Sequence, residues 1–209
     1  MLIRAGDGSF LARVYFYIYM VMKIYFLSLA IILLVCNTNA QNRTNVWELS
    51  YSDTVAYPNS EMRYSNSIMD TNKVFRVMSF FDTDASICDT SGNLLFYSNG
   101  LIIGNSNYDT LKNAINFNQG WLTNSYEPIG MGVCQGAIII PYPDHPFKYF
   151  IFSVSGELLP AAAIEPLHLS YSVVDMNLDG GLGGIVDSLK NKFAVEDTLS
   201  HGGLMAVKH

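Results

Sequence analysis

Three oxygen-bearing side chains with calcium-loop spacing are the residues best placed to do chemistry: Asp175, Asn177 and Asp179. Gly180 follows them in the order D-x-N-x-D-G, which matches the first half of a calcium-binding loop. The twelfth position of such a loop would be Val186, whose side chain cannot bind a metal. The pattern therefore favours a structural Asp/Asn–Gly turn, with calcium as the alternative and no other cofactor expected.

Other reactive side chains occur without the neighbours that catalysis needs. Asp82 and Asp84 are close in sequence, but glycoside hydrolysis needs two carboxyls facing each other across a sugar. Ser153 and Ser155 lack the G-x-S-x-G context of a nucleophile, and the glycines at 180–184 lack the Lys-Ser/Thr of a phosphate loop. The histidines do not show zinc-ligand spacing: His145, His168, His201 and His209. The sequence thus shows no set of catalytic residues, which favours a non-enzymatic protein without excluding an enzyme.

The cysteines allow one disulfide. Cys36 lies in a segment that we expect to be removed, which leaves Cys88 and Cys134. An even number of cysteines in an oxidising compartment permits a bond between them. Two buried, unpaired thiols are the alternative, because free cysteine often packs as a small apolar residue.

Composition narrows the class of protein. The 209 residues are 50% hydrophobic, 13% aromatic and 14% charged, with a formal net charge of −6. Many aromatic and few charged residues are typical of a folded domain rather than a disordered chain. The negative charge argues against nucleic-acid binding, which needs a basic surface.

Residues 1–40 are predicted to be an N-terminal extension followed by an export signal peptide. Lys23 precedes an apolar run over residues 24–35, and small residues stand at −3 and −1 of a cleavage point after Ala40. The run of about a dozen residues is too short to span a bilayer alone, and an uncleaved anchor is the alternative. We expect translation to start at Met20 or Met22. We expect the chain to contact the membrane only through its signal segment during export, and the mature chain to be secreted or held on the outer cell surface.

The elements that must position these side chains are β-strands. Apolar runs at Ala137–Ile140 and Lys148–Val154, rich in Ile, Phe and Tyr, predict two strands. The prolines between them, at 141, 143 and 146, cannot continue a central strand. Residues 167–174 alternate, which predicts a half-buried strand with its apolar face formed by Leu167, Leu169, Tyr171 and Val173.

Turn residues divide the rest of the chain. Asp89 to Asn93 joins two apolar runs and predicts a β-hairpin over residues 86–97, and Asn99-Gly100 marks a second tight turn. Further strands are expected at 47–51, 74–81, 101–103 and 185–193. Residues 58–72 are expected to form a polar loop, and 108–132 a long connection with a short helical turn near 111–115.

The strand signals recur as four-stranded antiparallel units. Residues 89–104 look like the middle of one unit, 136–193 like a full unit, and 203 onward like the start of another. Such recurrence is the signature of β-propellers, which close at about four blades or more. Residues 41–209 supply about two to three blades. We therefore predict an all-β, partial β-propeller-like domain over 41–209, not closed and truncated at its C-terminus.

Four segments in order resemble a known family: SICDTSGNLLFYSNG, CQGAIIIPYPDHPFKYFIFSV, LHLSYSVVDMNLDGGLGGIV and LMAVKH. They are similar to the N-terminal propeller-like region of large secreted Bacteroidetes proteins, over roughly residues 47–209. In that family a signal peptide precedes the region. Immunoglobulin-like repeats and a C-terminal sorting domain for type IX secretion, of the gliding-motility-associated group, often follow it. The resemblance implies a surface location more than an activity.

These observations predict a non-enzymatic secreted or cell-surface module, the N-terminal fragment of a larger protein, that binds a glycan or a protein. Aromatic residues could line a glycan platform or pack in the core: Tyr142, Phe147, Tyr149, Phe150 and Phe152. Two alternatives stay open. The chain is part of a propeller-type polysaccharide hydrolase or lyase whose active site lies beyond it, or it is a truncated gene product without function.

Overall fold

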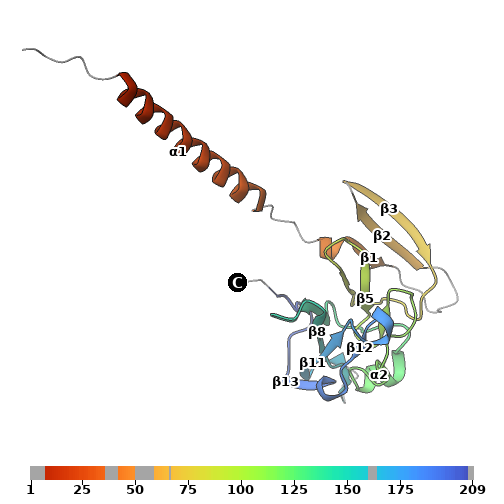
Figure 1. The fold of residues 1–209 in the computed structure, drawn as a ribbon. Coiled ribbons are helices and arrows are strands. Elements are labelled where there is room, and N and C mark those ends of the chain that lie inside the picture. The colour runs from red at the N-terminus through yellow and green to blue at the C-terminus, as the bar shows by residue number, and fades with distance from the viewer. Residues whose placement is uncertain (1–7, 36–41, 50–58, 66, 160–163, 207–209) are drawn as a thin grey trace, which may run out of the picture. The chain divides into compact units, whose positions relative to one another are not determined.

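A computed structural model describes residues 8–35, 42–49, 59–65, 67–159 and 164–206. Contacts divide the chain into two units, Met1–Ala40 and Gln41–His209. The first contains the helix α1 (Gly8–Val35), drawn in red in Figure 1. Within the described ranges, no helix combines the length and apolar character needed to cross a membrane. The predicted cleavage point after Ala40 lies outside the described residues.

The second unit is built from antiparallel sheets, which confirms the all-β prediction (Figure 1). The first sheet contains β1 (Val46–Leu49), β2 (Asn59–Ser65) and β3 (Ile68–Val74). The second contains β4 (Ala85–Cys88), β5 (Leu94–Ser98) and β6 (Ile103–Asn105). The third runs in the order β12-β11-β8-β7, with β13 also paired to β11: β7 (Ala137–Pro141), β8 (Lys148–Val154), β11 (His168–Asp175), β12 (Gly184–Ile185) and β13 (Lys192–Glu196).

Short elements complete the unit. β9 (Glu157–Leu158) and β10 (Ile164–Glu165) pair with each other, and α2 (Trp121–Tyr126) lies in the long connection. Three 3₁₀ turns are η1 (Asn42–Thr44), η2 (Asp179–Gly181) and η3 (Asp187–Leu189). The helical turn expected near residues 111–115 is thus wrong in position, since the helix of this connection begins at Trp121.

The β4–β5–β6 sheet is covered on both faces. Phe96 of β5 packs in a cluster with Tyr149 and Ile151 of β8, and the Phe96 and Tyr149 ring centroids lie 5.6 Å apart. The next residue, Tyr97, points the other way into a cluster with Val46 of β1. Successive strand residues face opposite sides, so a strand covered twice needs apolar residues at every position. This explains the unbroken apolar run of β5.

The third sheet confirms the two strands predicted around the proline turn, but corrects the prediction for β11. On the predicted apolar face Leu169 and Tyr171 are only half-buried and Val173 is buried, whereas the opposite face is buried at Ser170, Ser172 and Val174. The buried hydroxyls have partners: Asn191 N donates to Ser172 Oγ at 2.9 Å, and Ser170 Oγ lies 3.5 Å from the Ser153 carbonyl oxygen. A satisfied hydroxyl costs little to bury.

The segment before β4 also differs from the prediction. The expected loop over 58–72 contains the β2–β3 hairpin, paired from Asn59 opposite Val74 to Ser65 opposite Ile68. β3 is an edge strand with mostly exposed side chains, so backbone pairing forms it without an apolar pattern. The strand expected at 74–81 is wrong beyond Val74, since the following residues form an irregular segment. The strand expected at 185–193 is split into β12, η3 and β13.

Candidate functional site

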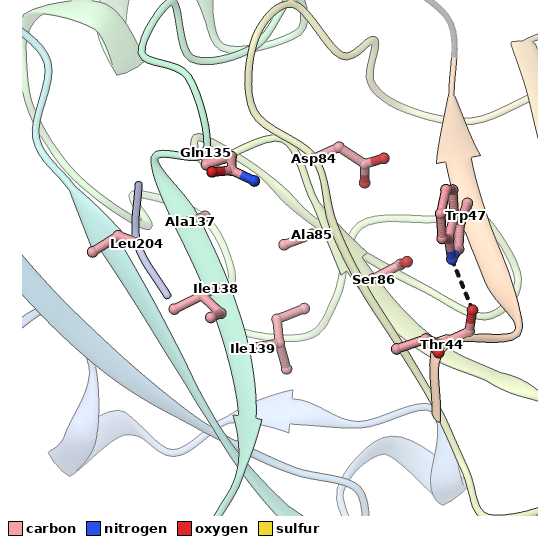
Figure 2. Close-up of a pocket in the computed structure, with 10 residues that line it drawn as sticks. All are labelled: Thr44, Trp47, Asp84, Ala85, Ser86, Gln135, Ala137, Ile138, Ile139 and Leu204. Carbon is pink, nitrogen blue, oxygen red and sulfur yellow. Dashed lines mark hydrogen bonds between the residues drawn. The ribbon is translucent and has the colours of Figure 1, made fainter. Parts of the chain in front are cut away.

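A pocket of about 520 Å³ lies beside two sheet edges (Figure 2). β4 ends the order of its sheet and β7 ends the order of the third sheet. Residues of both strands line the pocket, together with Trp47 of β1. The described lining is Thr44, Trp47, Asp84, Ala85, Ser86, Gln135, Ala137, Ile138, Ile139 and Leu204. The volume falls within the range of small-ligand sites, and the lining mixes polar and apolar side chains.

Trp47 forms one side of the pocket. Its neighbours Val46 and Glu48 are buried, so strand alternation turns the Trp47 side chain outward, where it is 55% exposed. The indole Nε1 donates to the carbonyl oxygen of Thr44 at 2.8 Å, which restrains the ring. Figure 2 shows Trp47 across the pocket from the β7 residues, with Ser86 between them. An aromatic ring that is restrained and exposed offers a rigid apolar face to a ligand.

Asp84 and Gln135 form the polar end of the pocket (Figure 2). Burial by the surrounding protein raises the pKa of Asp84 toward about 7, and the Arg76 charge opposes the rise. The residue is nevertheless accessible to water, so solvent screening limits this shift. Gln135 has a left-handed backbone with φ 49°, which is uncommon for a residue with a side chain.

A pair of hydrogen bonds ties the two polar residues' segments together. The Thr83 hydroxyl donates to the carbonyl oxygen of Val133, and Gly136 N donates to Thr83 Oγ1 at 2.8 Å. Gln135 N also donates to the carbonyl oxygen of Asp82 at 3.2 Å. The polar end is therefore built from two chain segments about 50 residues apart in sequence, held by buried contacts.

Apolar side chains line the side of the pocket opposite Trp47. Ala137, Ile138 and Ile139 come from β7, and Leu204 lies near them in Figure 2. Ser86 of β4 donates its hydroxyl to the carbonyl oxygen of Val46 at 2.7 Å. This bond links β4 to β1, the strand that carries Trp47.

Behind Trp47, a buried polar network anchors β1. Glu48 and Glu61 stand directly opposite each other on β1 and β2, and both are fully buried. Arg76 forms an ion pair with Glu48 in which neither side chain is exposed, and it also donates to the carbonyl oxygen of Leu49. Its guanidinium lies 4.7 Å from the Phe80 ring centroid, a cation–π distance.

The two opposed glutamates have opposite pKa shifts. Burial raises the pKa of Glu48 to about 8; Arg76 opposes the rise and neighbouring Glu61 adds to it. Burial also acts on Glu61, but hydrogen bonds from Arg63 and Tyr108 hold its pKa below the ordinary value. The Tyr108 hydroxyl donates to Glu61 Oε2 at 2.6 Å. Two adjacent carboxyls thus prefer to share one negative charge. Because Glu48 is fully buried, its role is to position β1 rather than to meet a ligand.

The calcium-loop residues form a turn. Asp175 Oδ1 accepts from the backbone N and the Nδ2 of Asn177, both at 2.9 Å, and Lys148 Nζ lies 3.7 Å from Asp175 Oδ2. Lys112 Nζ lies 4.0 Å from Asp179 Oδ1. These contacts fit the Asp/Asn–Gly turn interpretation. Among residues whose placement is described, no group of three or more His, Cys, Asp or Glu side chains could hold a metal.

The other sequence candidates are dispersed. Cys88 is a buried free thiol and Cys134 an exposed one, so the possible disulfide between them is not formed. His201 Nε2 lies 3.0 Å from Glu165 Oε2, away from the pocket lining, and His209 lies outside the described residues. Of the candidate platform aromatics, Tyr149 is in the core, and Phe150 stacks on Tyr142 with ring centroids 4.3 Å apart.

The pocket contains residues that sequence reasoning did not single out. Trp47 and Gln135 have no motif around them, and only Asp84 was considered, as half of an adjacent carboxylate pair. The one available signal was a tryptophan at an outward position of a predicted strand. No known family model, curated protein or solved structure matches the chain. The case for function therefore rests on the geometry of the pocket.

Proposed function

We propose that this chain is a non-enzymatic binding module of a secreted or cell-surface protein, and that the pocket beside Trp47 is its binding site. The observation that carries the proposal is an exposed aromatic ring, restrained by its own hydrogen bond, across a pocket from an apolar strand edge. Ligand pockets characteristically combine apolar and aromatic walls with a few placed polar groups.

The sheet order supports a propeller-like setting for this pocket. The second sheet runs β4, β5, β6 in space, and the third runs β7, β8, β11, so both start at the strand that lines the pocket and proceed away from it. Propeller blades are antiparallel sheets arranged around a central channel. The pocket would then lie where the first strands of two blades face that channel, a common place for ligands.

The set of lining residues favours binding over catalysis. Asp84 is the one carboxyl among the described residues that line the pocket. Hydrolysis of a glycosidic bond ordinarily uses two carboxyls on opposite sides of the bond. A single acid beside a restrained indole is a more complete arrangement for holding a ligand than for cleaving it.

One observation favours a second candidate, a propeller-type polysaccharide hydrolase or lyase. Burial raises the pKa of Asp84, which is the direction that a general acid requires, although the exposure of this side chain to water limits the rise. In this reading a second group, supplied from outside the described lining, would complete the site.

One experiment separates the two candidates. The full chain is incubated with insoluble polysaccharides and with protein-coated beads, and both bound protein and released reducing sugar are measured. The proposal predicts binding without turnover. Turnover that disappears in Asp84→Asn would favour the hydrolase or lyase. A natively folded chain that neither binds nor cleaves any of these materials would contradict both candidates.

A further inference from the structure

We infer that the pocket binds a neutral pyranose ring of a glycan, stacked on Trp47 and hydrogen-bonded at the Asp84–Gln135 end. This inference rests on the proposed function, and it names the ligand class and the residues that would recognise it. It is carried by the arrangement of one aromatic face, one polar end and one apolar side within the same pocket.

The aromatic face suits a sugar. One face of a pyranose presents several C–H groups, which are apolar and slightly positive, and the face of an indole carries the negative part of its quadrupole. Trp47 is 55% exposed, and its Nε1 is already bonded to the Thr44 carbonyl oxygen. Its ring face, rather than its N–H, is therefore the part left for a ligand. The bond also reduces the entropy that the ring would lose on binding.

The polar end suits sugar hydroxyls. Neighbouring hydroxyls on a pyranose each need a donor or an acceptor. A carboxylate supplies two acceptor oxygens, and an amide side chain supplies both donors and an acceptor. Asp84 and Gln135 lie at the same end of the pocket in Figure 2, on segments joined through Thr83 and Gly136. Polar groups on tied segments fix the orientation of a bound ring.

The charge of the lining selects for a neutral sugar. Among the described residues that line the pocket there is no Lys or Arg, and Asp84 is the one ionisable side chain. A uronic acid, sulfated sugar or phosphate would meet the like charge of Asp84, and Arg76, the cation that acts on Asp84, is buried and paired with Glu48. A neutral pyranose avoids this repulsion, and the side formed by Ile138 and Leu204 can cover its other apolar edges.

The test measures binding of neutral oligosaccharides by titration calorimetry with the full chain. The probes are the soluble oligomers of cellulose, xylan, mannan and laminarin, and any detergent must lack a sugar head group because such a group would compete. Trp47→Ala should weaken binding about tenfold or more, the loss expected for a central aromatic contact. Trp121→Phe is the matched control, because Trp121 lies on α2 and outside the pocket lining.

Three results would overturn the inference. If Trp47→Ala binds the oligosaccharide as the natural chain does, the sugar sits elsewhere and the proposed binding function survives. If the chain binds protein-coated beads but none of the four probes, the ligand is not a neutral sugar and the proposed function again survives. If a natively folded chain binds neither, both fail. Should Trp47→Ala unfold the chain, Ala85→Phe replaces it, since added bulk on β4 would fill the pocket and abolish sugar binding without removing the indole.

Discussion

Replacing Glu48 with glutamine should remove much of the pH dependence of stability. Glu48 is fully buried opposite Glu61, and Arg76 contacts its Oε2. Glutamine has nearly the same shape, and its amide oxygen can still accept from Arg76. The substitution therefore deletes a titrating group while leaving the packing in place.

The magnitude follows from proton linkage. The pKa of Glu48 rises from the ordinary 4.5 to about 8 in the folded chain, so between these values the folded chain holds a proton that the unfolded chain releases. Its stabilisation is complete below about pH 4.5 and is lost as pH rises through about 8. The slope is about 1.4 kcal/mol per pH unit where the folded chain holds the whole proton and half of that at the folded pKa, so the loss between pH 6 and pH 8 is about 2 kcal/mol.

Urea unfolding of the full chain, followed by far-UV circular dichroism at several pH values, measures this slope. In Glu48→Gln the slope of the unfolding free energy against pH should be smaller by about 1.4 kcal/mol per pH unit. Glu127→Gln, which removes an exposed carboxyl, should keep the slope of the natural chain. Asp84 is present in all three proteins, so its contribution cancels in the comparison. Equal slopes for the natural chain and Glu48→Gln would refute the raised pKa of Glu48.

Three further predictions concern other parts of the unit. Arg76→Ala should lower the free energy of unfolding by about 3 kcal/mol, because the buried Glu48 carboxyl and the Leu49 carbonyl oxygen lose their hydrogen-bond donor; a urea midpoint equal to that of the natural chain would contradict this. Cys134 should react with iodoacetamide in the folded chain. Cys88 should react only after unfolding, because this thiol is buried and burial raises its pKa. Peptide mapping of the labelled chain checks this prediction, and a disulfide between the two cysteines would contradict it. Asp175→Ala should cost about 1 kcal/mol equally with calcium or with EDTA, and a calcium-dependent rise in the melting temperature of the natural chain would restore the metal interpretation.

Local patterns predicted the strands that pack on both sides. β8 begins and ends at the residues expected from its apolar run, because the proline turn before it leaves no alternative pairing register. The β4–β5 hairpin follows from the turn between Asp89 and Asn93, where Asp89 Oδ1 accepts from the backbone N of Ser91 and of Asn93. In these segments local propensity and tertiary packing agree.

Elements that depend on distant partners could not be predicted in the same way. The β2–β3 hairpin carries polar residues on both faces, and its pairing with β1 is what forms it. On β11 the serines at 170 and 172 are buried as well, and Asn191 supplies a hydrogen-bond partner for Ser172 from elsewhere in the chain. Neither contact leaves a periodic signal in the sequence.

The candidate site also depends on residues that are distant in the sequence. Its walls come from residues 44–47, 84–86 and 135–139, and only the stacking of the three sheets brings these segments together. Sequence reasoning placed Trp47 on a strand and Asp84 at a strand end, but it gave no reason to join them. The expected export, surface location and glycan or protein partner stay predictions, since they concern events outside the fold.

The fluorescence of Trp47 offers the most direct test of the binding site. In a Trp121→Phe background Trp47 is the one tryptophan of the chain, since the sequence contains two. Titrating this variant with the neutral oligosaccharide that binds best should shift its emission to shorter wavelength, with a midpoint equal to the calorimetric dissociation constant. Binding by calorimetry without any change in Trp47 emission would place the ligand outside the pocket and contradict the proposed site.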